Sequence, residues 1–595
     1  MTNNISKRTH YCTDITEAHA GQHVTLYGWA HNTRKLGQLI FIALRDRTGL
    51  VQISLNENTT SVAVFETAKT VKNEYVLAIR GTVTLRAEKD INPDMATGKI
   101  EVIADELQII NSAETPPFQI GTDGVNEALR LKYRYLDMRR PEMQQNFLVR
   151  HKLNRAIREF YNANGFIEIE TPTLTKGTPE GAREYMVPSR VSPGDFYVLP
   201  QSPQQFKQLL MLGGFDRYFQ IARCFRDEDS RGDRQPEFTQ LDVEMSFINR
   251  EDIFDNTERM LATVFKEAIG IDVPLPLMRM GYEEAMARYG SDKPDLRFGM
   301  EIHDVTKICS GTEFEVFNAA LAESKSSIRG IKVAGQAALP RKQQDALQEY
   351  VRTFKAKGLI FISLSENSEV KSSVSKFVND DKLKEILSAF KAEPNDLVIL
   401  CAGVNGIVAD ALGNLRNEMA RRLDIISKDE YRFLWITDIP LLEQDEETGK
   451  WNAVHHPFTA PMPEDADLFE TNPGAMRAQA YDVVLNGYEL GGGSIRITNS
   501  DMQRRMFKTL GLSEEEIDTR FGHMIEAYKY GAPTHGGIAL GVDRIAMLMT
   551  GAENIREVIA FPKTKDARCP LTDAPGAADD AYLKELGISV NKINN

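Results

Sequence analysis

The chain contains 595 residues, of which 42% are hydrophobic and 26% charged, and its formal net charge at pH 7 is −14. This length exceeds what one hydrophobic core usually supports, so we expect several domains, and the composition excludes a disordered or membrane-embedded chain. The acidic balance excludes nucleic-acid binding by bulk charge alone, so any RNA contact must come from local basic patches.

The sequence also favours a cytoplasmic location. No apolar run is long enough to cross a bilayer, and the start MTNNISKRTH has no apolar core, so we expect no membrane partner. The cysteines form no close pair, which argues against a zinc site and a disulfide framework: Cys12, Cys224, Cys309, Cys401 and Cys569.

Residues 1–112 show the pattern of a small β-barrel. Strands are expected at 24–31, 39–46, 51–55, 75–86 and 100–110, with one helical segment at 61–71. This order predicts a five-stranded OB fold, which presents a strand face to single-stranded nucleic acid and stacks bases on aromatic side chains. Phe41 lies in such a strand among basic residues, although the pattern alone fits a core position equally well.

Residues 113–140 have the composition of a connector. It begins with Thr115-Pro116-Pro117 and continues as the basic amphipathic segment LRLKYRYLDMRR, whose cations are candidates for contact with a nucleic-acid backbone. A long helix is expected at 142–164, because apolar residues recur there at spacings of three and four, and Gly165 ends it. A strand at 166–170 then leads to a proline.

Two segments carry candidate ligand-binding residues. The loop KGTPEGA at 176–182 has the composition of a mobile loop, and its Glu180 is either an ordinary surface acid or an acceptor for an ammonium group. QSPQQFKQLLM begins an amphipathic helix in which Gln204 and Lys207, three residues apart, share one face.

The hairpin at 218–247 is the densest group of polar side chains. In its second strand every other residue from Phe238 to Ser246 shares a mainly polar face with Asp242 and Glu244, because side chains alternate with period 2. The connecting loop DSRGDRQ adds cationic side chains of the kind that bind phosphates. The alternative is a solvated hairpin with scattered ion pairs.

Residues 295–425 look like an insertion, because lysine and serine increase and aromatic residues become fewer. The pair His455-His456 follows it. Adjacent histidines do not readily face one ion, and no cysteine or carboxylate is placed to complete a site, so metal binding there is not favoured.

The last polar cluster combines acids, glycines and arginines. Asp482, Glu489 and Arg496 follow one another at spacings of seven, and a β-bulge at the intervening glycines 491–493 is predicted to bring Glu489 and Arg496 to the same face. GGIALGVDRIA then has the pattern of a strand, a glycine turn and a helix start, with Arg544 in the first helical turn.

Three of these segments resemble the signature motifs of one family. FRDED followed by QPEFTQLDVE is similar to motif 2 of the class II aminoacyl-tRNA synthetases, the long helix with its glycine, strand and proline is similar to motif 1, and GGIALGVDRIA is similar to motif 3. The resemblance covers nearly the whole chain. The insertion resembles in place and length the GAD-type insert of the bacterial aspartyl branch, which belongs to subclass IIb. A homodimer with motif 1 at its two-fold interface is implied.

The implied fold is an α+β multidomain chain, with an N-terminal OB-fold β-barrel and an antiparallel β-sheet catalytic domain that is flanked by helices and interrupted by an α+β domain of the GAD type. The expected boundaries are 1–112 for the anticodon-binding barrel, 113–140 for the hinge, 141–294 and 426–560 for the catalytic domain, 295–425 for the insert and 561–595 for a C-terminal extension.

The resemblance implies an aspartate–tRNA ligase, which activates L-aspartate with ATP to aspartyl-adenylate, releases diphosphate and transfers aspartate to the 3′ end of tRNA(Asp). The protein must supply positive charge and geometry, because one anion attacks another in the first step. Arg226 is expected on the α-phosphate and Arg544 on the γ-phosphate and adenine. Phe238 is expected to stack on the other face of the adenine, with Glu228 at its amino group.

The remaining site residues follow from the same resemblance. Asp482 and Glu489 would supply oxygen ligands for Mg²⁺, the expected cofactor of ATP. The catalytic residues are expected to be Arg226, Glu489 and Arg544. The ATP-binding residues are expected to be Arg226, Asp227, Glu228, Gln235, Phe238, Glu489, Gly541, Val542, Asp543 and Arg544. The aspartate-binding residues are expected to be Glu180, Gln204, Gln205, Phe206, Lys207, Arg226, Asp242, His455 and Arg496, and the anticodon-binding residues Arg34, Phe41, Gln52 and Glu101.

Two cations, Arg496 and Lys207, are expected where a substrate carboxylate would lie, oriented by Asp242, so that asparagine would leave buried charge uncompensated.

Two alternatives stay open. One is an asparaginyl-tRNA synthetase, a branch that lacks the long insert. The other is a non-catalytic RNA-binding adaptor, which would be expected to lose the phosphate arginines or the metal acids. Leu36 resembles the version that serves tRNA(Asp) alone.

Overall fold

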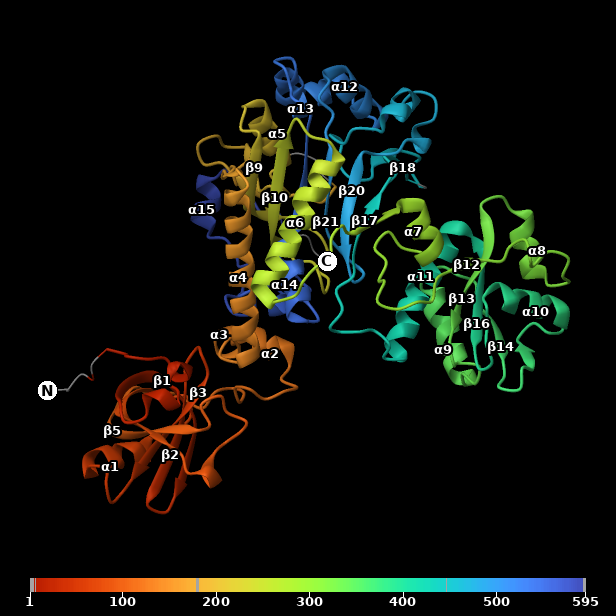
Figure 1. Cartoon of the computed structure of the whole chain (residues 1–595). Helices are drawn as coiled ribbons and strands as arrows, with labels where there is room; N and C mark the ends of the chain where they lie inside the picture. The colour runs from red at the N-terminus through yellow and green to blue at the C-terminus, as the bar shows by residue number, and fades with distance from the viewer. Residues whose placement is uncertain (1–4, 6, 178–180, 446, 592–595) are drawn as a thin grey trace. The chain divides into compact units, whose positions relative to one another are not determined.

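The computed structural model in Figure 1 divides into two compact units, residues 1–149 with 556–577 and residues 150–555 with 578–595. It describes residue 5 and residues 7–177, 181–445 and 447–591. Among these residues no helix is both long and apolar enough to span a membrane.

The first unit contains a closed β-barrel, which confirms the predicted OB fold. Its elements are β1 (His23–Leu36), β2 (Leu39–Arg45), β3 (Leu50–Asn56), helix α1 (Val62–Thr70), β4 (Val76–Leu85) and β5 (Ile100–Asn111), with short 3₁₀ helices η1 (Cys12–Asp14), η2 (Glu17–His19) and η3 (Glu88–Asp90). The strand order is β1-β2-β3-β5-β4. Alternation fills the core from one face of each strand: Ile40, Ile42 and Leu44 are buried, whereas Phe41 between them is half-buried.

The connector forms two short helices, α2 (Glu127–Lys132) and α3 (Arg134–Asp137), before the long helix α4 (Pro141–Ala163). Asp137 is fully buried and accepts hydrogen bonds from Arg130 (2.8 Å) and Arg134 (2.7 Å). Arg134 also donates to the carbonyls of Ala560 (3.0 Å) and Ile559 (2.9 Å). The prediction that this segment offers its cations to a nucleic-acid backbone is therefore wrong for Arg134, which holds the C-terminal segment in place.

The second unit is built on an eight-stranded sheet. Its strands are β6 (Ile167–Glu168), β9 (Arg217–Phe225), β10 (Glu237–Ser246), β11 (Met278–Gly281), β17 (Phe433–Thr437), β20 (Ala480–Leu485), β21 (Tyr488–Ile495) and β22 (His535–Gly541). They follow the order β11-β17-β20-β21-β22-β10-β9-β6. The two outermost pairs, β11-β17 and β6-β9, are parallel and the others are antiparallel.

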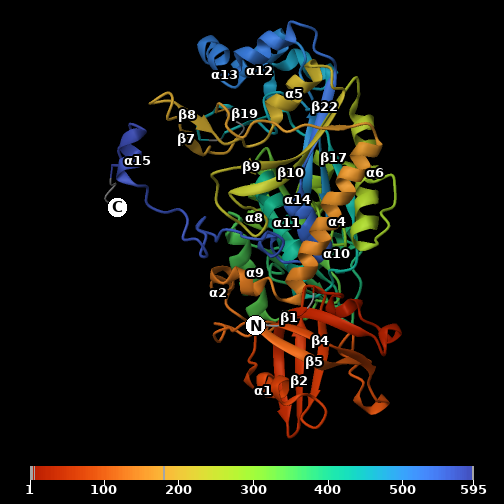
Figure 2. The same ribbon diagram turned by 90° about the vertical axis from the view of Figure 1, so that its left-hand side faces the viewer.

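Helix α6 (Arg250–Ile269) lies along one face of this sheet in both views (Figures 1 and 2). Its Phe254 packs against Trp435 and Tyr481, and its Glu258 accepts a hydrogen bond from the indole of Trp435 (3.0 Å). Because side chains alternate along a strand, Asp482 next to Tyr481 points to the other face. The remaining elements around the sheet are α5 (Gln204–Leu212), α12 (Ser500–Thr509), α13 (Glu514–Tyr528), α14 (Val542–Thr550), α15 (Asp580–Glu585), β7 (Met186–Pro188), β8 (Phe196–Val198), β18 (Leu442–Gln444), β19 (Trp451–Ala453), η4 (Pro463–Leu468), η5 (Pro473–Ala475) and η6 (Ile555–Glu557).

The predicted bulge is present between β20 and β21. Val483 pairs with Gly491 and Val484 pairs with Glu489, so Leu490 is the extra residue. The bulge lies immediately before the three glycines, one residue earlier than expected.

The segment expected as an insertion carries its own five-stranded sheet, in the order β12-β13-β16-β14-β15, with β12 (His303–Asp304), β13 (Ser326–Val333), β14 (Ile360–Leu364), β15 (Val370–Ser372) and β16 (Leu397–Val404). Helices α9 (Arg341–Arg352) and α11 (Asn405–Arg422) cover one face, and α8 (Glu315–Ala322) and α10 (Asp380–Ala389) cover the other. Helix α7 (Tyr282–Tyr289) precedes it. The GAD-type identity of this domain stays a prediction.

Candidate active site

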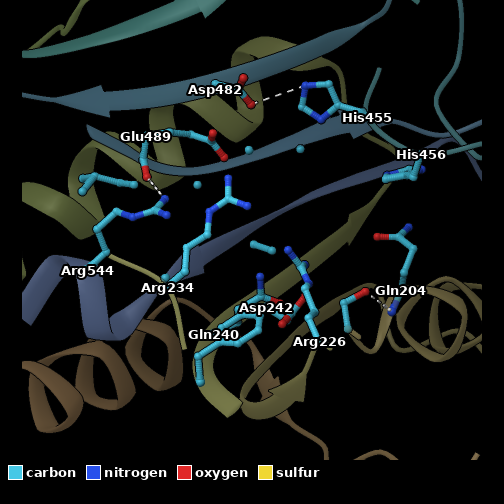
Figure 3. A pocket seen from close by; sticks show the side chains of 18 of the residues that line it. Gln204, Arg226, Arg234, Gln240, Asp242, His455, His456, Asp482, Glu489 and Arg544 are labelled. Atoms are coloured by element: carbon cyan, nitrogen blue, oxygen red, sulfur yellow. Dashed lines mark hydrogen bonds and ion pairs between the residues drawn. The ribbon is translucent and has the colours of Figure 1, made fainter. Parts of the chain in front are cut away.

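A cavity of about 530 Å³ lies in the second unit, on the polar face of β10 (Figure 3). Side chains from α5, β10, β20, β21 and the start of α14 converge on it. The predicted site residues that line it are Gln204, Lys207, Arg226, Glu228, Gln235, Phe238, Asp242, His455, Asp482, Glu489, Arg496, Gly541, Asp543 and Arg544.

The other predicted residues of this centre lie elsewhere. Gln205 and Phe206 line a separate cavity of about 80 Å³, because successive helical residues point in different directions. Asp227 does not line the large cavity, and its backbone N–H donates to the carbonyl of Arg183 (3.0 Å). Val542 is buried in α14, and Glu180 lies outside the described residues. The ligand roles of these residues stay predictions.

Four buried ionisable side chains interact at the cavity: Lys207, Asp242 and Arg496 line it, and Glu244 pairs with the two cations. Arg496 donates through Nε and Nη2 to the two oxygens of Glu244 (2.8 and 2.9 Å), and Lys207 donates to Asp242 Oδ1 (3.0 Å) and lies 3.5 Å from Glu244 Oε2. Burial alone would raise the pKa of Glu244, but Arg496 and Lys207 outweigh it and hold that pKa below its ordinary value. Burial keeps the pKa of Asp242 raised, despite Lys207.

His456 and Ser494 hold Arg496 from a second side. Nη1 of Arg496 lies 2.7 Å from His456 Nε2 and donates to Ser494 Oγ (2.7 Å). Burial, and then the charge of Arg496, lower the pKa of His456 well below its ordinary value, so the imidazole is neutral at pH 7. A neutral ring nitrogen accepts from the guanidinium and fixes its orientation.

Two arginines from the motif 2 region also face the cavity, and Arg226 lies beside Asp242 (Figure 3). The guanidinium of Arg226 lies over the ring of Phe238, 5.1 Å from its centroid, and its buried Nε has no hydrogen-bond partner. Arg234 pairs with Glu228 at 3.2 Å. Guanidinium groups with unused donors suit the oxygens of a polyphosphate.

The first turn of α14 adds a third arginine. Arg544 donates to the carbonyl of Glu489 and pairs with Asp233 at 3.1 Å. Its neighbour Asp543 accepts a hydrogen bond from the backbone N–H of Thr239 (2.8 Å), which ties α14 to β10.

Asp482 and Glu489 face the cavity from adjacent strands. Burial, followed by Glu489 and Asp292, raises the pKa of Asp482 well above its ordinary value. Its buried Oδ1 forms no hydrogen bond and lies 3.4 Å from Nε2 of His455. A Cβ on Gly492 would lie 2.0 Å from this oxygen, so the glycine leaves room for the carboxylate. Two such carboxylates suit Mg²⁺, although no group of three His, Cys, Asp or Glu residues in the described ranges is arranged to hold a metal ion.

In the first unit, the four predicted anticodon residues gather on the outer face of the barrel. Arg34 and Phe41 pair opposite each other in β1 and β2, and Phe41 lies opposite Ser54 of β3. Gln52 Nε2 donates to Glu101 Oε2 (2.9 Å). Phe41 is thus half-buried and does not belong to the barrel core, and its stacking on an anticodon base stays a prediction.

Residues 126–565 match the family described as "tRNA synthetases class II (D, K and N)", and residues 24–110 match the "OB-fold nucleic acid binding domain" family. The chain belongs to the class II aminoacyl-tRNA synthetases. This synthetase is 52% identical over 587 residues to the aspartate–tRNA ligase of Ruminiclostridium cellulolyticum and 53% identical over 586 residues to that of Geobacillus kaustophilus. It is 54% identical over 586 residues to the aspartate–tRNA(Asp/Asn) ligase of Thermoanaerobacter pseudethanolicus. These alignments cover 98% of this chain and 98%, 99% and 98% of the respective relatives.

The fold of the synthetase is also that of a solved structure. The asparaginyl-tRNA synthetase from Pyrococcus horikoshii, complexed with asparaginyl-adenylate, has a TM-score of 0.60 and 18% sequence identity, and the alignment covers 94% of this chain and 99% of that chain. At this identity the likeness shows the fold alone.

Sequence patterns assign no site role to three residues that line the synthetase's cavity or support it. Glu244 lies two residues after Asp242 on the same predicted face, so the alternation itself carried a signal. His456 was considered as a metal ligand, which was not favoured, and the resemblance marked only its neighbour His455 as a substrate contact. Asp292 lines the cavity from the segment after α7, where no motif or periodicity marks it.

Proposed function

We propose that this protein is an aspartate–tRNA ligase, which activates L-aspartate with ATP to aspartyl-adenylate, releases diphosphate and transfers aspartate to the 3′ end of tRNA(Asp). The observation that carries the proposal is the buried pair of cations, Lys207 and Arg496, at one end of the cavity. Relatives at 52–54% identity that are named aspartate–tRNA ligases support it.

Hydrogen-bond donors, rather than unbalanced charge, select aspartate. Asp242 and Glu244 already neutralise the two cations, so the expectation that asparagine would leave charge uncompensated is wrong. Lysine and arginine have donors only, and both oxygens of a carboxylate accept, whereas asparagine presents an NH₂ group to one of them. A buried donor left without an acceptor costs about 1–3 kcal/mol.

In the first step, the aspartate carboxylate attacks the α-phosphorus of ATP and diphosphate leaves. We assign Arg226 to the α-phosphate, where its unpaired Nε supports a contact with the developing charge. Arg544 is assigned to the γ-phosphate and adenine, Phe238 to the opposite face of the adenine and Glu228 to its amino group. In the second step, the terminal ribose hydroxyl attacks the carbonyl, a phosphate oxygen of the adenylate takes the proton and AMP leaves.

Asp482 and Glu489 are the residues that would hold Mg²⁺. The buried Oδ1 of Asp482, which forms no hydrogen bond, supports this assignment, as does the preference of Mg²⁺ for a few carboxylates together with phosphate oxygens. When bound, Mg²⁺ neutralises phosphate charge.

We further infer that the barrel binds the anticodon of tRNA(Asp) through Arg34, Phe41, Gln52 and Glu101. Relatives named for tRNA(Asp/Asn) occur beside relatives named as aspartate–tRNA ligases, and Leu36 supports a preference for tRNA(Asp). The similarity to motif 1 supports a homodimer, and the family supports a cytoplasmic location.

ATP–pyrophosphate exchange with aspartate or asparagine tests the proposal. Exchange is expected with aspartate alone. Exchange with asparagine but not aspartate would favour the asparaginyl alternative, and no exchange with either would favour the adaptor. Aminoacylation of tRNA(Asp) and tRNA(Asn) transcripts then tests the choice of tRNA.

A further inference from the structure

The inserted domain reaches the active-site cavity through one short segment. Residues 290–299 follow α7 and lead into the insert, and Asp292 in this segment lines the same cavity as Asp482 and Glu489. The side chain of Asp292 is 41% exposed and has Lys293 as its ion-pair partner (3.2 Å). Its carboxylate is thus available at the end of the cavity where the two acids lie.

A buried arginine of the insert holds this segment. Arg416 in α11 is 1% exposed, and its Nη2 donates to the carbonyls of Asp295 (2.9 Å), Phe298 (3.3 Å) and Gly299 (3.0 Å). Its guanidinium also lies 4.9 Å from the ring centroid of Tyr289 and 4.4 Å from that of Phe298. Its buried Nε has no hydrogen-bond partner, so Nη2 makes the hydrogen bonds that offset the cost of burying this cation. Because these bonds go to three carbonyls of residues 295–299, they fix the path of that backbone.

Two close contacts of glycine residues also hold this segment, one with helix α11 and one with the β20–β21 turn. A Cβ on Gly413 of α11 would lie 2.6 Å from the carbonyl oxygen of Gly290, so the insert packs directly on the end of α7. A Cβ on Gly487 would lie 3.3 Å from the Cβ of Asp295, which places Asp295 against the β20–β21 turn. Glu489 lies two residues after this glycine in the sequence.

From these contacts we infer that Arg416 is a positioning residue for Mg²⁺–ATP: by fixing residues 290–299, it holds Asp292 and the β20–β21 turn at the end of the cavity formed by Asp482 and Glu489. Mg²⁺ usually keeps several waters, and the Asp292 carboxylate would accept hydrogen bonds from water bound to the ion. The insert is then a working part of the catalytic centre. This inference rests on the proposed function for its ligand.

Calorimetric binding of Mg²⁺ with a non-hydrolysable ATP analogue, measured on the full chain, tests the inference directly. Asp292→Asn and Arg416→Lys are each expected to weaken this binding by about tenfold. The Michaelis constant for aspartate in pyrophosphate exchange is expected to stay unchanged. The double variant is expected to bind the nucleotide no more weakly than whichever single variant binds it more weakly, because the two residues act on one feature. Arg421→Lys, a change to an exposed arginine of the same helix, is the matched control and is expected to match the parent.

Nucleotide binding that is unchanged in Asp292→Asn would overturn the role of Asp292, and unchanged binding in folded Arg416→Lys would overturn the positioning role. Equal loss of nucleotide and aspartate binding would also overturn the inference, because it indicates a general defect. If Arg416→Lys does not fold, Phe298→Leu replaces it, since it removes one ring from the guanidinium. A parent protein without aspartate-dependent exchange would overturn the proposed function instead.

Discussion

The guanidinium of Arg496 and the carboxylate of Glu244 form a bidentate pair, at 2.8 Å from Nε to Oε1 and 2.9 Å from Nη2 to Oε2. Neither side chain is more than 3% exposed. The pair joins β10 to the chain that follows β21, so it contributes to the sheet as well as to the site. Glu244 occupies Nε and Nη2 of Arg496, and His456 and Ser494 contact Nη1, so the guanidinium is held in one orientation where it lines the cavity.

Glu244→Gln is expected to lower the free energy of unfolding by about 3–5 kcal/mol, because it leaves a buried charge without its partner. It is also expected to raise the Michaelis constant for aspartate more than that for ATP, since Arg496 loses its orientation. Urea unfolding and exchange kinetics measure the two effects. Glu526→Gln, which removes an exposed pair with Lys529, is the control and should leave the free energy of unfolding close to that of the parent, because solvent screens an exposed pair. A parent-like stability of Glu244→Gln would contradict the expectation.

Arg226→Ala is expected to abolish adenylate formation while the fold stays intact, because it removes the guanidinium that we assign to the α-phosphate and whose buried Nε has no hydrogen-bond partner. The measurement is aspartate-dependent pyrophosphate exchange, with circular dichroism to verify folding. Arg217→Ala, at the exposed start of β9, serves as the control. Activity of Arg226→Ala within about tenfold of the parent would remove Arg226 from the mechanism.

Local sequence patterns predicted those parts of the site whose geometry is set by residues close together in the sequence. Period-2 alternation placed Asp242 on the polar face of β10, and the odd spacing from Glu489 to Arg496 required a bulge, which the structure contains. Gln205 and Phe206 were predicted from the resemblance and not from the helix face that Gln204 and Lys207 share, and one residue along a helix turns a side chain by about 100°. Asp292 lies at the cavity only because distant parts of the chain hold it, so no local pattern indicates it.

Gly492→Ala is expected to displace the Asp482 carboxylate, because the added Cβ would lie 2.0 Å from Oδ1 and 3.1 Å from Cε1 of His455. The pyrophosphate exchange rate should then fall, and more Mg²⁺ should be needed for half-maximal rate. Gly522→Ala is the matched control, since a Cβ at this helical position meets no atom within 4 Å. If both variants show the same Mg²⁺ dependence as the parent, Asp482 is not the affected ligand.

Stability is expected to decrease as the pH falls below 6.5, the ordinary pKa of histidine, because burial lowers the pKa of His456 in the folded protein. Between the lowered pKa and 6.5, the unfolded chain binds a proton at this site and the folded chain does not. The raised pKa of Asp482 acts in the opposite direction, so the comparison must isolate one group. Urea unfolding at several pH values should show a smaller pH dependence for His456→Asn than for the parent. An identical pH dependence would exclude His456 as its source.

Phe41→Ala is expected to weaken aminoacylation and to spare aspartate-dependent pyrophosphate exchange. The reason is that Phe41 is half-buried on the outer face of the barrel, in the first unit, whereas the cavity for ATP and aspartate lies within the second. Stacking of a base on an aromatic side chain contributes about 1–3 kcal/mol, so the Michaelis constant for tRNA should rise by about five- to 150-fold. Leu85→Ala, at an exposed position of β4, removes apolar surface elsewhere on the barrel and should leave both reactions unchanged. Equal loss of exchange and aminoacylation in Phe41→Ala would show that the residue supports the fold instead of binding tRNA.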